Sequence, residues 1–140
     1  MPRPDPYRAF RFRIEIDGAI EGGFQSVMGL ERQCQIEPYR EGGINHYEHQ
    51  LITLTNYPAL VLKRGLLDAD LWRWHQDVID GDVKRKTLSI MLLDERGEEA
   101  WRWVCAEAFP SKWTMADLDA SANNIAMESI EFVHQGLTRL

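Results

Sequence analysis

Hydrophobic and polar residues alternate over most of this chain, as they do in half-buried β-strands. Phe10, Phe12, Ile14 and Ile16 alternate with polar neighbours, and the run ends at Asp17-Gly18, a dipeptide typical of tight turns. Short apolar runs predict strands at residues 51–54 and 59–62. Further strands are predicted near residues 32–39, 87–93, 99–109, 111–115 and 125–136. The pattern predicts a mostly-β domain, a sandwich or barrel of short strands and turns.

One segment follows the period of a helix instead. Over residues 70–80 the polar side chains occupy one face, and most of the remaining surface is apolar. Asp68 is placed to cap the start of this helix and Gly81 to end it. A helix on the rim of a small domain needs an apolar arc of about 100°. Because this arc is wider, we expect part of it to contact another chain, with Trp72 or Trp74 as half of the interface.

Two other stretches are candidates for contacts between subunits. The loop Pro38–Gln50 is long and polar but carries apolar anchors, and loops of this length tend to be either functional or poorly ordered. We expect it to dock on a neighbouring subunit. Lys63-Arg64 stands where a strand is expected to turn towards the helix, and we expect it to meet an acidic surface of the next subunit. The candidate interface residues are Tyr39, Glu41, Gly42, Gly43, Ile44, Asn45, Tyr47, Lys63, Arg64, Trp72 and Trp74.

Length and composition fit one domain over residues 1–140, with residues 1–9 as a proline-rich extended arm. The chain has 140 residues, 44% of them hydrophobic, which suffices for a real core. Its net charge of −6 disfavours a nucleic-acid-binding domain, which usually carries a basic excess. The sequence shows neither a membrane-length apolar run nor the apolar region of a secretory signal. We therefore expect a protein made in the cytoplasm.

The sequence offers few candidates for catalysis or metal binding. His46-Tyr47-Glu48-His49 holds two imidazoles and a carboxylate, but without further converging ligands a solvated loop is the favoured interpretation. Cys105 with His75 or His134 is a candidate nucleophile and base. However, Cys105 lies in an apolar strand, where a buried and inert thiol is the default. We expect no enzyme activity, no metal and no cofactor.

Two remaining features have ordinary interpretations. Cys34 and Cys105 are expected to be buried free thiols, since two cysteines far apart in sequence make no disulfide framework. The basic cluster Val83-Lys84-Arg85-Lys86 is interpreted as a solvated turn. Contact with phosphate, or ion pairing with an acidic neighbouring surface, are the alternatives for this cluster.

Several segments, in order along nearly the whole chain, resemble the tail-tube protein family of contractile phages and phage-derived injection systems. Each motif is weak alone, but their shared order is specific. Met28 departs from the family pattern, in which a small polar residue is commoner. The matching segments are Phe12-Arg13-Ile14-Glu15-Ile16-Asp17-Gly18, Gly23-Phe24-Gln25-Ser26-Val27-Met28-Gly29-Leu30, Tyr39-Arg40-Glu41-Gly42-Gly43-Ile44-Asn45, Leu62-Lys63-Arg64-Gly65, Leu71-Trp72-Arg73-Trp74, Pro110-Ser111-Lys112-Trp113 and residues 128–137.

The resemblance implies two packed antiparallel sheets, a β-sandwich or barrel, with one α-helix on the outside. It also implies hexameric rings that stack into a tube inside a contractile sheath, with inner sheets lining a channel for DNA or protein cargo. The implied partners are other copies of the chain, sheath and baseplate proteins, and the cargo, without direct membrane insertion. The implied location is a phage tail or an extracellular injection particle, assembled from a protein made in the bacterial cytoplasm.

Two alternatives stay open at this point. The same fold also makes tube-initiating or adaptor rings at a baseplate, and sequence separates these roles poorly. From a different class, a monomeric β-sandwich could bind a ligand through its loop at residues 38–50. Size in solution discriminates between the classes, because rings or tubes indicate a structural subunit and a stable monomer indicates a binding module.

Overall fold

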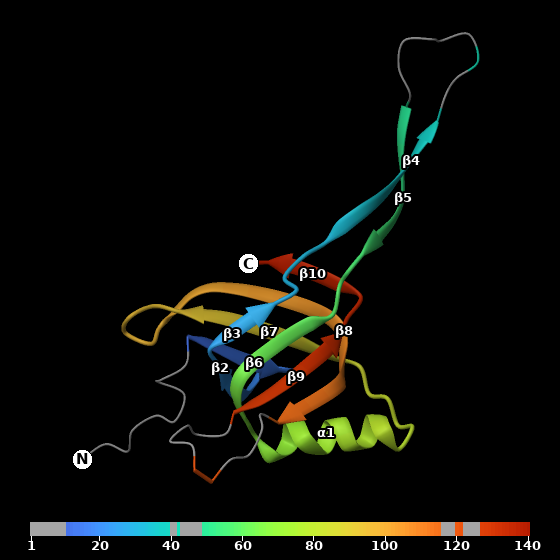
Figure 1. Cartoon of the computed structure of the whole chain (residues 1–140). Helices are drawn as coiled ribbons and strands as arrows, with labels where there is room; N and C mark the ends of the chain where they lie inside the picture. Colours follow the sequence, from blue (N-terminus) through green and yellow to red (C-terminus); the bar gives the residue numbers. More distant parts are fainter. Residues whose placement is uncertain (1–10, 40–41, 43–48, 116–119, 122–126) are drawn as a thin grey trace.

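The computed structural model describes residues 11–39, 42, 49–115, 120–121 and 127–140. It has a sandwich-like β body, one helix and a two-stranded ribbon that projects from the body (Figure 1). The predicted mostly-β fold with a single helix is therefore confirmed. The elements are β1 (Phe12–Ile16), β2 (Ala19–Phe24), β3 (Ser26–Met28), β4 (Gln33–Tyr39), β5 (His49–Asn56), β6 (Leu60–Leu67), α1 (Ala69–Ile79), β7 (Lys86–Leu93), β8 (Glu99–Met115), β9 (Glu128–Val133) and β10 (Gly136–Arg139).

The body consists of two antiparallel halves that share strands. One half, which we call the β7 half, has the order β10-β8-β7-β1-β2, and the β9 half has the order β3-β6-β9-β8. Strand β8 serves both halves, because it pairs with β7 and β10 as far as Ala108 and with β9 from Phe109 onwards. Strand β6 also joins them, pairing with β2 near its end and with β3 and β9 before that.

The hydrophobic core lies between the two halves. Ile14 and Ile16 of β1 are 0% and 7% exposed, so the alternation read from the sequence assigns the correct face. Phe24 packs so closely over Gly65 that a Cβ there would lie 2.0 Å from the ring, which explains the need for glycine. The buried core residues are Ile14, Ile16, Phe24, Leu60, Leu62, Leu71, Trp74, Leu88, Ile90, Cys105, Ala108, Ile130 and Phe132.

Helix α1 has the predicted limits and caps. The Asp68 side chain accepts a hydrogen bond from the Asp70 amide at 3.4 Å, and Gly81 follows the helix with a φ of 94°. Both features supply what helix ends require, an acceptor for free N–H groups and a left-handed residue after the last turn. The Trp74 indole lies against Phe132 and donates to the Lys84 carbonyl at 2.8 Å. The helix is thereby fixed at one end of the sandwich.

A partly exposed arginine ties the outer face of the β7 half together. Arg102 of β8 donates to both oxygens of Glu99, at 2.6 and 2.9 Å, and to Glu15 of β1 at 2.8 Å. These hydrogen bonds raise the pKa of Arg102 and lower the pKa of Glu99. Since β7 lies between β1 and β8, the pair with Glu15 spans three strands.

The predicted strand boundaries are wrong at three places. Lys63-Arg64-Gly65 is no corner, because β6 continues to Leu67 across a register shift between Leu62 and Gly65. Pro110 does not end its strand, because it lies beside a second register shift where β8 begins to pair with β9. Proline is tolerated at such irregularities, where a ladder N–H is not needed. The final predicted strand divides into β9 and β10 at residues 134–135.

Candidate subunit interfaces

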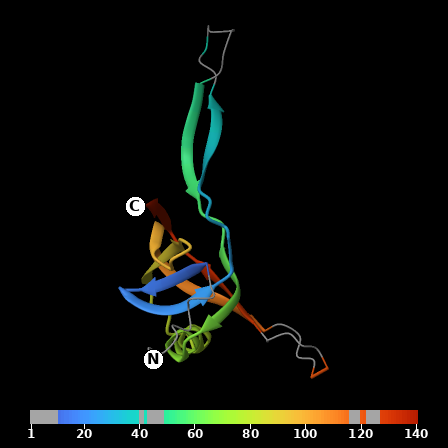
Figure 2. The ribbon, with the colours of Figure 1, turned by 90° about the vertical axis from the view of Figure 1, so that its left-hand side faces the viewer.

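Strands β4 and β5 form a ribbon that leaves the body, and we call their residues 33–39 and 49–56 the arm (Figures 1 and 2). Within the described chain these two strands pair only with each other. Of the four residue types Asp, Glu, Lys and Arg, these two strands contain only Glu37. The exposed large apolar residues of the arm are Ile36 (56%), Tyr39 (50%), Leu51 (48%), Ile52 (71%) and Leu54 (63%).

The arm has the properties of a segment that another chain covers. Its cross-strand pairs Ile36–Ile52 and Glu37–Leu51 lie on opposite faces, so both faces of the ribbon carry apolar side chains. An isolated two-stranded ribbon is marginally stable in water, and exposed apolar strand edges favour pairing with a further chain. The arm therefore presents a largely apolar contact surface with a single acidic side chain of the Asp or Glu type, Glu37.

The predicted docking loop corresponds to the end of this arm. Strand pairing reaches Tyr39 and His49, so the connection is shorter than the predicted 38–50 loop. Tyr39 and Gly42 are exposed. A contact of this region with a neighbouring subunit stays a prediction. The other predicted contact residues of the loop and the candidate metal motif have side chains outside the part that the structure describes: Glu41, Gly43, Ile44, Asn45, Tyr47 and the motif His46-Tyr47-Glu48-His49.

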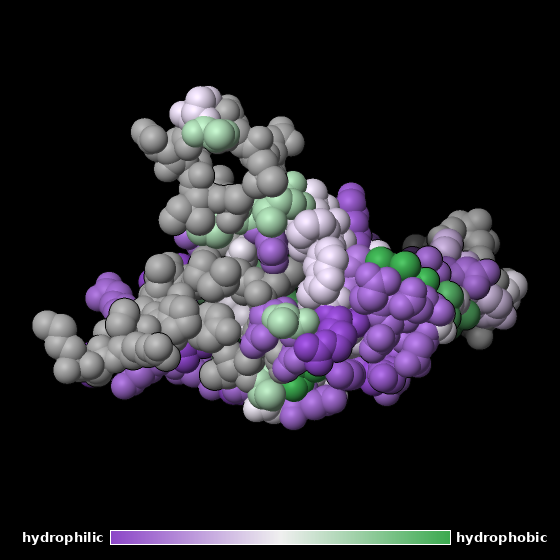
Figure 3. All heavy atoms as spheres, turned by 90° about the horizontal axis from the view of Figure 1, so that it is seen from below, coloured by the Kyte–Doolittle hydropathy of each residue, from purple (hydrophilic) through white to green (hydrophobic). Residues whose placement is uncertain are grey.

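The two tryptophans of α1 have different environments. Trp74 is 3% exposed and belongs to the core, whereas Trp72 is 46% exposed and meets Trp113 edge-on at 4.6 Å between ring centroids. Ile79, in the last turn, is 64% exposed. Seen from the helix end, the described surface is mostly hydrophilic, with separate apolar spots (Figure 3). Only part of the wide apolar arc is thus free for a partner, and Trp72 stays a predicted interface residue.

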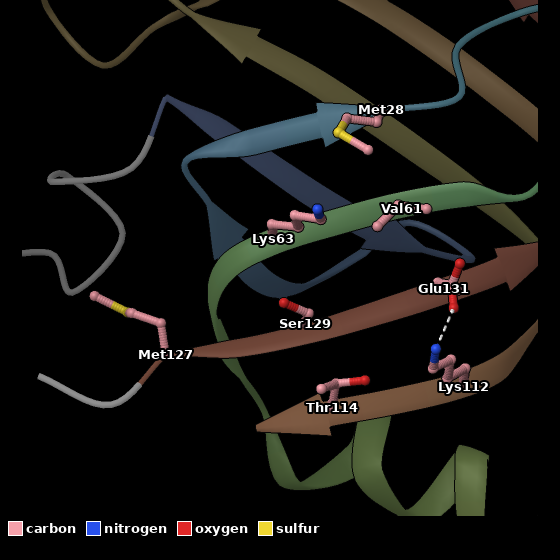
Figure 4. A pocket seen from close by; sticks show the side chains of 8 residues that line it. All are labelled: Met28, Val61, Lys63, Lys112, Thr114, Met127, Ser129 and Glu131. Carbon is pink, nitrogen blue, oxygen red and sulfur yellow. Dashed lines mark ion pairs between the residues drawn. The ribbon is translucent and has the colours of Figure 1, made fainter. Parts of the chain in front are cut away.

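The open face of the β9 half is concave. Its side chains line a hollow of about 530 Å³, in which Lys112 lies 3.8 Å from Glu131 (Figure 4). Lys63 reaches the same hollow and has no ion pair within the described residues. The side chain of Arg64 is not described. The residues lining the hollow are Met28, Val61, Lys63, Lys112, Thr114, Met127, Ser129 and Glu131.

The basic cluster after α1 is engaged within the chain. Lys84 lies 3.7 Å from Asp77 and 3.4 Å from Asp82, Arg85 stacks over Phe109, and Lys86 lies over Trp74. Exposed ion pairs and cation–π contacts contribute about 1 kcal/mol or less each. The interpretation as a simple solvated turn was therefore incomplete, because these cations hold the end of α1 against the body.

The two cysteines are free, but only one is buried. Cys105 is fully buried, and burial raises the pKa of its thiol to about 12. The expectation of a buried Cys34 is wrong, because β4 leaves the body and exposes it. Within the described chain no hydrogen bond joins Cys105 to His75 or His134. The described residues also contain no group of three or more His, Cys, Asp or Glu side chains that could hold a metal ion.

Native thiol alkylation is expected to label Cys34 and spare Cys105. Attack requires an accessible thiolate, and burial removes both the access and the charge at Cys105. Mass spectrometry of the native subunit after alkylation should show one adduct, and the Cys34→Ser variant should show none. Rapid labelling of Cys105 in folded protein would support the cysteine-enzyme alternative.

Comparisons with known proteins agree with this geometry. The profile of the family described as T4-like virus tail tube protein gp19 matches residues 8–138. No curated protein sequence matches the chain. None of the helices in the described part is long and apolar enough to cross a membrane.

Three solved structures illustrate the shared fold. A chain of the anti-feeding prophage baseplate is 27% identical, with a TM-score of 0.67, over 100% of this chain and 97% of that chain. A chain of the PVC extracellular contractile injection system sheath-tube complex is 24% identical, with a TM-score of 0.76, over 99% and 91%. Hcp1 from Flavobacterium johnsoniae is 12% identical, with a TM-score of 0.56, over 93% and 94%.

Proposed function

We propose that this chain, which belongs to the T4-like virus tail tube protein gp19 family, is a structural inner-tube subunit of a contractile injection system, and that its copies form stacked hexameric rings. The observation that carries this proposal is the arm, an exposed apolar ribbon on a body that is otherwise well packed. Such a subunit acts by assembly, and the proposal assigns it no catalytic role.

Ring closure follows from the strand edges of the β9 half. Among the described residues, β3 pairs with β6 alone, and residues 109–115 of β8 pair with β9 alone. The four strands of this half alternate in direction. In a cyclic ring all copies point the same way, so β3 of one copy would meet β8 of the next as an antiparallel partner. Joining these edges closes a barrel and removes the free edges.

The hollow of the β9 half is the proposed channel wall. Its opposite face, which includes Leu62, Ile130 and Phe132, lies in the core, so the concave side faces the inside of a closed barrel. Lys63, Lys112 and Glu131 supply charges of both signs there. A hydrated wall of mixed charge suits the passage of DNA or protein cargo without strong binding.

Stacking is the proposed task of the arm, with sheath and baseplate proteins as outer partners. The arm projects from one end of the body, where it would reach the adjacent ring or the neighbour in the same ring (Figure 2). The relatives of known structure are chains of a sheath-tube complex and of a baseplate. Trp72 and Ile79 on α1 are the apolar groups that such partners would cover on the helix side.

A tube-initiating ring at a baseplate is the second candidate role. It is favoured by the 27% identity to a chain of the anti-feeding prophage baseplate, against 24% for the sheath-tube chain. Electron microscopy of the purified protein separates the outcomes. Long tubes indicate the main tube protein, single rings an initiator, and a stable 16.2 kDa monomer at high concentration the binding-module alternative.

Charge reversal tests the predicted contact at Lys63 and Arg64. We expect Lys63→Glu or Arg64→Glu to leave the subunit folded but to slow or abolish tube growth, because a small contact recurs at every interface. High salt should slow growth of the native protein in the same direction through screening. Arg96→Glu is the matched control, since Arg96 lies exposed in the turn between β7 and β8. Normal tube growth of both Lys63→Glu and Arg64→Glu would contradict the predicted contact with the next subunit, and Lys63 would then be only a residue of the channel wall.

A further inference from the structure

Both strands of the arm are anchored to one short segment of the body. The arm connects to the body through residues 29–32 before β4 and residues 57–59 after β5. These connections lie beside residues 134–137, at the passage from β9 to β10 (Figure 1). We call residues 134–137 the seat. Few residues separate the arm from the seat, so contacts there bear directly on the direction of the arm.

On the β4 side, an arginine reaches the seat. The Arg32 guanidinium donates to the Leu137 carbonyl at 3.1 Å, although the two residues are 105 positions apart in sequence. Just before it, Gly29 has a φ of 90°, and a Cβ at this position would lie 2.2 Å from the Ala59 carbonyl oxygen. The two connections therefore lie in close contact at Gly29.

On the β5 side, an aromatic pair makes the equivalent contact. The Tyr57 ring lies 5.4 Å from the ring of His134, at 53°. His134 is 4% exposed, and its Nδ1 lies 3.1 Å from the Gly136 carbonyl oxygen. Desolvation lowers the pKa of His134, and backbone carbonyls beside the ring oppose this shift. Since a carbonyl oxygen only accepts, Nδ1–H is the donor of the bond to Gly136. A buried, hydrogen-bonded ring is a firm surface for Tyr57.

We propose that the seat fixes the direction of the arm, with Arg32 and Tyr57 as positioning residues, one for each strand. The proposal rests on the proposed function, because a fixed direction matters when the arm must dock on a neighbouring copy. An arm free to swing would be competent to dock for only a fraction of the time. The apparent affinity of the arm for the neighbouring copy equals its intrinsic affinity multiplied by that fraction.

Distance measurements on the isolated subunit test the seat without requiring assembly. Spin labels at Gln50→Cys on the arm and Gln76→Cys on α1, in a Cys34→Ser background, report the direction of the arm. Cys105 is fully buried and should stay unlabelled. We expect one narrow distance distribution for the double-labelled subunit with an unchanged seat, and a distribution broadened about twofold or more by Arg32→Ala or Tyr57→Ala. Arg32 is exposed, so its truncation should spare the fold.

Matched variants make the result specific. Tyr57→Phe keeps the ring contact, and Arg73→Ala removes an exposed arginine of α1 that pairs only with Asp70 in the described chain. Both should leave the distribution narrow. Tube growth of Arg32→Ala should slow by about tenfold if one arm direction in ten is competent. A broad native distribution, or narrow distributions in Arg32→Ala and Tyr57→Ala, would overturn the seat. If the native protein forms no tubes while the distances behave as expected, the proposed function fails and the seat stands.

Discussion

Trp74→Ala is expected to destabilise or unfold the subunit, whereas Trp72→Ala should leave its stability nearly unchanged. Trp74 is 3% exposed, packs on Phe132 and donates to the Lys84 carbonyl, so its loss leaves a cavity and removes the bond that holds the end of α1. Truncation of a buried large aromatic costs about 3–5 kcal/mol. Urea unfolding of the isolated subunits, followed by tryptophan fluorescence and circular dichroism, measures the difference.

Trp72 carries the other half of this prediction. It is 46% exposed and touches Trp113 by an edge, which leaves much of its ring free to be covered in an assembly. Trp72→Ala should therefore give a folded subunit that assembles poorly with its ring neighbour, sheath or baseplate partner. Ile79→Ala is a useful companion, because it removes the other exposed apolar group of the helix. Equal loss of monomer stability in the two tryptophan variants would contradict this assignment.

The helix shows what could be predicted from sequence and what could not. Its limits depend on local chemistry, an Asp68 cap and a glycine after the last turn, and both were predicted correctly. Which tryptophan faces the core depends on where the rest of the chain lies. The wide apolar arc contains both tryptophans. The sequence gives no signal that one of them packs against Phe132 while the other is exposed to solvent.

The arm shows a different limit. The apolar positions of β4 and β5 predicted strands, but such a pattern has the same appearance whether a strand faces a core or another subunit. Ile36, Ile52 and Leu54 were therefore not identified as contact residues. The scarcity of charge along both strands was the available signal, because solvated strands normally carry charged residues on their free face.

The remaining errors have a tertiary origin. β6 runs past Lys63, and β8 runs past Pro110, because in each strand a register shift marks a change of pairing. No local residue pattern encodes a second partner strand. Likewise Gly65 seemed to mark a corner, whereas it makes room for the ring of Phe24, a residue 41 positions earlier in the chain.

Replacing apolar side chains of the arm should abolish tube formation without unfolding the body. In the double variant Ile52→Thr, Leu54→Thr the new residues are β-branched, so the strand itself is preserved. Ile52 and Leu54 are 71% and 63% exposed in the subunit, so the core loses nothing. Burial of one such side chain at a contact contributes about 1.5–3 kcal/mol, so losing most of two should raise the subunit concentration needed for growth about a hundredfold.

Controls on the same chain make this prediction strict. Leu140→Thr removes a side chain that is 76% exposed but lies at the end of β10, and Ile52→Val keeps an apolar group on the arm. Both should assemble as the native protein does, as judged by light scattering and electron microscopy.

Deleting Glu41–Tyr47 should give a folded domain, with native circular dichroism, that makes no tubes. If the double variant and the deletion both grow tubes at native concentrations, the arm is no stacking contact, and the subunits must be held together by the strand edges and the helix alone.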